Sequence, residues 1–137
     1  MLEPITNIQF VPRHNLITWY PRGILDFAMA SRTVEFLTFQ ERVLDEPFNR
    51  FADWSMVSEV HIDLKQINEF AERRRETYGE GPAVKSAFYA PSFAAGVVAQ
   101  MFSQLMKSSP IEVKVFNELK GACEWLGVPM EDLQSAS

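Results

Sequence analysis

The sequence predicts a single α/β domain in which helices cover a mostly parallel sheet. Strand-like stretches alternate with helical stretches of about ten or more residues, in the order β-β-α-β-α-β-α-β-α. The chain has 137 residues, 47% of them hydrophobic, which suits one domain with a proper core. No internal repeat or linker divides it, and right-handed crossovers are expected.

The chain begins with a predicted β-hairpin. Ile8–Val11 is extended, Pro12–Asn15 forms the turn and Leu16–Tyr20 returns. β-branched and aromatic residues dominate both arms, and turn formers separate them. Pro21–Gly23 ends the second strand.

A long helix is expected next, from about Asp26 to Leu44. The Asp26 carboxylate can cap it, and apolar residues at spacings of three, four and seven form one stripe. Pro47 ends the helix because proline disfavours helical geometry in the residue before it. A strand region over Phe48–Val57 follows, centred on Arg50–Trp54.

The remaining elements are predicted from the same signals of periodicity, capping and breaking residues. They are a helix over Asp63–Tyr78, a strand over Ala83–Tyr89, a helix from Ser92 to Met106, a strand over Ile111–Phe116, and a helix over Glu118–Leu126 capped by Asn117. The domain is expected to span residues 1–129, and residues 130–137 to form a polar, frayed tail. The charge run Glu72–Glu76 is interpreted as a solvated helix face.

Composition narrows the classes of partner. A net charge of −5 argues against a nucleic-acid surface, which needs clustered Lys and Arg. The single cysteine, Cys123, excludes an internal disulfide and is expected to be a buried, inert thiol. The most apolar stretch, Ala87–Phe102, is interrupted by Pro91 and too short to span a bilayer, so no stable membrane insertion is expected. Because no signal peptide precedes the domain, a cytoplasmic location is expected.

Two segments carry a resemblance to a known family. Asp53-Trp54-Ser55 stands at a strand end a few residues before the helix start at Asp63, and Phe116–Gly127 forms the last strand and helix. With the order of elements, these segments resemble the STAS domain, the fold of the SpoIIAA anti-sigma-factor antagonist, over about Ile5 to Val128. The resemblance implies the fold and a regulatory role in protein binding.

The phosphorylation motif of that family does not carry over. Counting from Asp53, the family's Asp-Ser-Ser-Gly falls on His61-Ile62-Asp63-Leu64, so the acceptor serine is replaced by Asp63, or by Ile62 if the gap shifts by one. Neither residue has a hydroxyl group, and the phosphoserine switch is therefore not expected. The wider fold also has lipid-binding and transporter-associated versions, so fold alone does not choose a function.

Asp63 allows two interpretations. A carboxylate at a helix start satisfies free amide groups and the helix dipole, and this structural role is favoured. Alternatively, Asp63 is a permanent partial mimic of a phosphoserine.

Candidate site residues cluster near the predicted strand ends, where ligands of open α/β sheets bind. The candidate partner-binding residues are Asp53, Trp54, Ser55, Ser58, His61 and Asp63. Ser92 and Asn117 are weaker candidates for binding an anion or another ligand at a helix start. His61 lacks the spaced ligands of a metal site, so neither a metal nor a cofactor is predicted.

The aromatic residues allow a core role or a surface role. Strands favour aromatic side chains, so a core role is preferred, and the alternative is that some line a groove or a dimer contact. These residues are Trp19, Tyr20, Phe48, Phe51 and Trp54.

The leading functional hypothesis is a non-enzymatic interaction domain. It would bind a protein partner, or itself as a homodimer, through the edge from Asp53 to Asp63. The alternative is a carrier of a small apolar ligand or lipid, since the apolar third helix and eleven Phe residues favour a pocket between that helix and the sheet. An enzyme ranks third, because spacing brings together only Asp53, His61 and Asp63.

Overall fold

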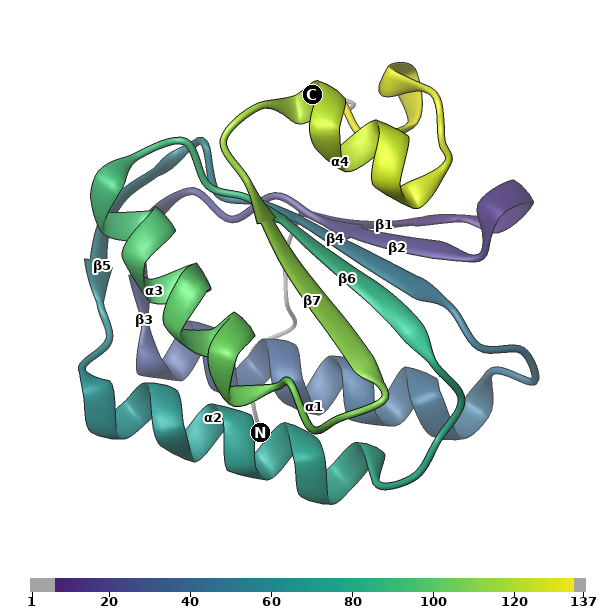
Figure 1. Cartoon of the computed structure of the whole chain (residues 1–137), viewed down its shortest axis with the longest axis horizontal. Coiled ribbons are helices and arrows are strands. Elements are labelled where there is room, and N and C mark those ends of the chain that lie inside the picture. Colours follow the sequence, from purple (N-terminus) through teal and green to yellow (C-terminus); the bar gives the residue numbers. More distant parts are fainter. Residues whose placement is uncertain (1–6, 135–137) are drawn as a thin grey trace.

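A five-stranded sheet forms the centre of the computed structural model, which describes residues 7–134 (Figure 1). The strands lie in the order β1-β2-β4-β6-β7. Their bounds are β1 (Ile8–Val11), β2 (Leu16–Trp19), β4 (Asn49–Asp53), β6 (Val84–Tyr89) and β7 (Ile111–Phe116). β1 and β2 form the predicted antiparallel hairpin, and every other neighbouring pair is parallel. The predicted α/β class is confirmed.

Helices cover both faces of this sheet unequally (Figure 1). Three helices pack on one face, and a fourth, shorter helix covers the other. The three are α1 (Phe27–Val43), α2 (Leu64–Tyr78) and α3 (Phe93–Leu105), and the fourth is α4 (Leu119–Leu126). Short 3₁₀ turns, η1 (Pro12–His14) and η2 (Met130–Asp132), complete the described chain.

A second, two-stranded sheet was not predicted. β3 (Gly23–Asp26) and β5 (Val57–His61) pair in parallel beside the ends of α1, α2 and α3 (Figure 1). The sequence predicted that Pro21–Gly23 only ends the hairpin and that one strand region runs over Phe48–Val57. The second prediction is wrong, because β4 ends at Asp53 and a turn separates it from β5, which begins at Val57. The β-branched Val57 and Val60 were the available signal for β5.

Helix caps follow the predictions with one exception. The Asp26 and Ser92 side chains each accept a backbone N–H three residues further on, at 2.9 and 3.3 Å. Asp63 forms a capping box with Gln66, in which each side chain accepts the other residue's backbone N–H. The predicted Asn117 cap is wrong by one residue, because Glu118 takes the N-cap position and its side chain makes no cap bond.

Alternation along the strands gives the domain two separate cores. The core under α4 is built around eight buried residues: Leu16, Tyr20, Phe51, Ala87, Ala122, Cys123, Val128 and Leu133. Burial raises the pKa of the Cys123 thiol, in line with the expected inert cysteine. The five aromatic residues considered for a surface role are all buried, which confirms the core role: Trp19, Tyr20, Phe48, Phe51 and Trp54.

The polar tail predicted from Met130 is wrong as far as Gln134. Leu133 is 0% exposed, and its carbonyl accepts the Tyr20 hydroxyl at 2.8 Å in a buried hydrogen bond. The carboxylate of Asp132 pairs with Arg13 and with His14, whose Nε2 lies 2.9 Å from Oδ2. The segment therefore packs on the hairpin through the buried Leu133, which its mostly polar composition did not predict. Residues 135–137 lie outside the described chain.

Among residues 7–134, no helix combines the length and the hydrophobicity needed to cross a membrane.

Candidate functional site

The predicted partner-binding stretch begins at a turn after β4. The Asp53 carboxylate accepts the backbone N–H of Ser55 at 2.8 Å, which closes the turn. Ser55 is exposed, but Trp54 between them is only 6% exposed and faces the interior under the three helices. Trp54 is thus placed to contribute to an internal site rather than to a flat outer surface.

The rest of that stretch lies on the surface. Ser58 and His61 are exposed on β5, and His61 Nε2 lies 3.8 Å from a carboxylate oxygen of Glu59, with both side chains more than half exposed. Asp63 is exposed as well and occupied by capping α2. Within residues 7–134, no three His, Cys, Asp or Glu side chains come together as metal ligands would.

Ser92 and Asn117 line a groove between the start of α3 and the end of β7. The groove has a volume of about 650 Å³, and Phe93 and Val97 lie along it on α3. Phe93 is 87% exposed and Val97 41% exposed. The structure therefore brings Ser92 and Asn117 to one edge, as the sequence predicted, and places two exposed apolar residues beside them.

A cavity of about 110 Å³ lies on the other side of α3, between the sheet and the three helices. Its walls are almost entirely apolar and come from α1, α2, α3 and four strands of the main sheet, with Leu25 of β3 at one end. The lining includes Trp19, Leu25, Val34, Trp54, Phe70, Phe88, Val98, Phe102 and Met106. This is where the sequence-based alternative expected an apolar pocket.

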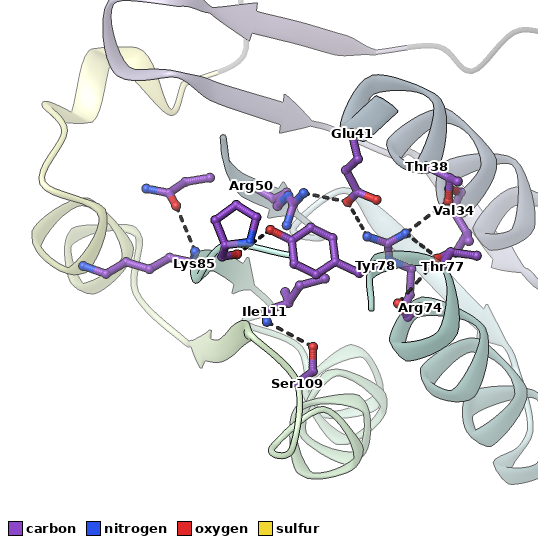
Figure 2. A network of polar contacts seen from close by, with 12 residues as sticks. Val34, Thr38, Glu41, Arg50, Arg74, Thr77, Tyr78, Lys85, Ser109 and Ile111 are labelled. Atoms are coloured by element: carbon purple, nitrogen blue, oxygen red, sulfur yellow. Dashed lines mark hydrogen bonds and ion pairs between the residues drawn. The ribbon is translucent and has the colours of Figure 1, made fainter. Parts of the chain in front are cut away.

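Two arginines also line this apolar space, and both contact one carboxylate. Figure 2 shows Glu41 reaching from α1 so that its carboxylate lies between Arg50 of β4 and Arg74 of α2. Arg50 Nη2 lies 2.6 Å from Glu41 Oε2, and Arg74 Nη2 contacts the same oxygen. Arg50 and Arg74 are 6% and 4% exposed, so the cluster is inside the domain.

The two arginines differ in how fully they are satisfied. Arg74 also donates to the hydroxyls of Thr38 and Thr77, at 3.2 and 3.3 Å. Arg50 donates to Glu41 through Nη2 and has the Tyr78 hydroxyl as a second polar neighbour, which raises the Arg50 pKa, while its Nε and Nη1 are buried without a hydrogen-bond partner. The indole N–H of Trp54 is likewise buried and unpartnered at the same cavity.

Aromatic rings partly compensate for the buried Arg50 charge. Its guanidinium carbon lies 4.3 Å from the ring centroid of Phe48 and 5.3 Å from that of Tyr78. Burial is the main reason that the pKa of Arg50 is lowered to about 10; Glu41 raises it and Arg74 lowers it. Arg50 is therefore still a cation at neutral pH.

Sequence reasoning missed this cluster. Arg74 was assigned to a solvated face within Glu72–Glu76; Arg73 fits that description, but Arg74 points inward. An arginine inside the apolar strand Arg50-Phe51-Ala52 was the available signal for a buried charge.

Comparison with known proteins supports the fold. No protein-family model matches the chain, and no curated protein matches it. One similar solved structure is that of an uncharacterised protein from the DUF3478 family with a SpoIIAA-like fold, from Shewanella loihica PV-4. It superposes with a TM-score of 0.52 at 13% identity, over 81% of this chain and 83% of that one. The chain thus has the SpoIIAA-like fold that its sequence resembled.

Proposed function

We propose that this SpoIIAA-like domain binds a small, largely apolar molecule in the cavity between its sheet and the three helices. The observation that carries the proposal is the cavity itself, an apolar space of about 110 Å³ with unpartnered donors at its wall. Pockets that combine apolar walls with a few placed polar groups are typical of ligand sites. The ligand-binding alternative thereby moves ahead of the interaction domain that the sequence favoured.

The proposed role of the cavity is to bind a ligand, and not to catalyse a reaction. Among residues 7–134, Arg50 and Arg74 are the only titratable side chains that line the cavity. A guanidinium stays protonated near neutral pH and is a poor general acid or base. Both arginines bind Oε2 of the Glu41 carboxylate, and its Oε1 is buried without a hydrogen-bond partner. These groups suit recognition of a ligand better than proton transfer.

The test is to look for a retained ligand and for binding of small apolar compounds. Native mass spectrometry of gently purified protein is expected to show a bound small molecule, and toluene is expected to shift the NMR signals of Val98, Phe102 and Met106. A ligand at 100 times its Kd would stabilise the fold by about 2.7 kcal/mol. A Ser86→Leu variant, which fills the cavity from β6, serves as the matched control. Absence of both retained ligand and toluene binding would overturn the proposal.

A second candidate function is self-association at the groove beside α3. Phe93 and Val97 lie one helical turn apart and are exposed, and large exposed apolar side chains that cluster often mark interfaces. Analytical ultracentrifugation is expected to show a dimer that Phe93→Ser dissociates. A monomer at all concentrations, with and without the substitution, would exclude this candidate.

A further inference from the structure

We infer that the ligand of the cavity is a compact monocarboxylate whose carboxylate is held by Arg50. The inference rests on the proposed function and adds to it the charge and the size of the ligand. Three observations carry it: the net charge of the buried cluster, the free donors of Arg50, and the volume and polarity of the cavity.

The buried cluster carries an uncompensated positive charge. Arg50 and Arg74 contribute two positive charges and Glu41 one negative charge, so the cluster has a net charge of +1. All three side chains are at most 11% exposed. Because a buried charge is costly unless it is paired, a cluster of this kind favours one further anion.

The donors of Arg50 show where that anion would bind. Arg50 uses Nη2 on Glu41, while Nε and Nη1 have no partner within the described chain. The Phe48 and Tyr78 rings cover the guanidinium, yet a ring face does not replace a hydrogen-bond acceptor at Nε or Nη1. A carboxylate accepts such N–H donors in short, charge-assisted hydrogen bonds.

Arg74 is a poorer receptor for the same anion. Its guanidinium already donates to Glu41, Thr38 and Thr77, and no atom of its side chain is buried without a partner. The neutral indole N–H of Trp54 offers a single donor and no charge. Arg50 is therefore the residue that we assign to the carboxylate.

The size and the walls of the cavity define the rest of the ligand. An engineered apolar cavity of about 150 Å³ binds benzene, and the space of about 110 Å³ here is smaller, so the apolar body can be no larger than one ring or a short branched chain. Phe70, Phe102 and Met106 would contact that body. A phosphate ester at neutral pH carries more charge than the cluster offers and would be poorly served by apolar walls. Aromatic and short branched monocarboxylates fit.

The experiment compares three compounds of similar shape: benzoate, its neutral isostere benzamide, and toluene. Binding is measured by titration calorimetry and by NMR shifts of the cavity residues. Benzoate is expected to bind wild-type protein roughly 10- to 100-fold more tightly than benzamide, the range expected for hydrogen bonds to a charged group. This comparison needs no variant, so a folding failure cannot obscure it.

Variants then locate the carboxylate. Arg50→Met is expected to abolish the preference for benzoate and to keep toluene binding. Arg73→Met removes an exposed cation from the same helix as Arg74 and is expected to change nothing. Trp54→Phe removes the other free donor and is expected to keep the benzoate preference. If Arg50→Met does not fold, Arg50→Lys is expected to retain a weakened preference.

Each result separates the two proposals. Equal binding of the three compounds would overturn the carboxylate inference and leave the apolar binding site standing. Loss of the preference in Trp54→Phe but not in Arg50→Met would also overturn it, because the carboxylate would then bind at the indole. Failure of all three compounds to bind would overturn both.

Discussion

The two faces of the main sheet are filled in different ways. Under α4, Phe51 and Ala87 pack against the helix and the C-terminal segment, and the buried Tyr20 hydroxyl donates to the carbonyl oxygen of Leu133. Under α1, α2 and α3, the neighbouring strand positions line a cavity and hold Arg50 with two free donors. The face under α4 is packed and its buried Tyr20 hydroxyl is hydrogen-bonded. The face under the three helices contains a cavity and a buried cation with unpartnered donors, both of which lower stability. The difference predicts that comparable substitutions on the two faces will change stability by different amounts.

The largest effect is expected from breaking the charge cluster of the cavity face. Glu41→Gln leaves two buried arginines without their anion, and we expect the free energy of unfolding to fall by about 3–5 kcal/mol. Denaturant unfolding measures the change. The matched control is Glu35→Gln, which removes the exposed partner of Arg73 between the same two helices and should cost less than about 1 kcal/mol. Similar losses in both variants would refute a special cost on this face.

A leucine truncated on each face should sharpen the comparison. Leu133 is 0% exposed under α4, and Leu25 is 1% exposed at the cavity. We expect Leu133→Ala to cost about 3 kcal/mol, and Leu25→Ala about 1 kcal/mol less, because Leu25 already borders empty space and loses fewer contacts. Thermal and denaturant unfolding of the two variants decide the order. A larger loss at Leu25 would show that the cavity face is as closely packed as the other.

The smallest effects, of opposite sign, are expected at two adjacent residues of β6. Ser86 lines the cavity, while Ala87 faces α4 and is 0% exposed. Ser86→Val should stabilise the fold by about 1 kcal/mol by filling space, and Ala87→Val should destabilise it by about 1–3 kcal/mol by overpacking. Both variants place valine on the same strand, so the strand propensity of the new residue is the same in each. Equal signs would contradict the contrast between the faces.

The sequence predicted the order of the main elements because hydrophobic period, caps and breakers agree over long segments. It did not predict β3 and β5, since a short parallel pair is defined by its partner rather than by local pattern. For the same reason, the packing of Leu133 on the hairpin escaped a prediction based on polar composition.

The candidate site was predicted only in outline. An apolar space behind the third helix followed from composition, and the roles of Asp63 and Ser92 as caps followed from position. The cluster of Arg50, Arg74 and Glu41 depends on a long-range meeting of β4, α1 and α2. Hydrophobic periodicity and residue spacing do not predict such a long-range contact. An arginine within a run of charged residues is predicted to be exposed, whether its side chain points outward or inward.

Successive residues of β4 and β6 face opposite sides of the sheet, and this affects how the sequence of the domain can change in evolution. Even-numbered positions of these two strands face the three helices and odd-numbered positions face α4, so neighbouring residues belong to separate parts of the interior. Substitutions at positions 86 and 88 would reshape the cavity while Phe51 and Ala87 keep the core under α4 intact. If the domain binds a ligand as we propose, a lineage that carries this scaffold would gain new specificities through single substitutions at such positions, without first rebuilding the core under α4.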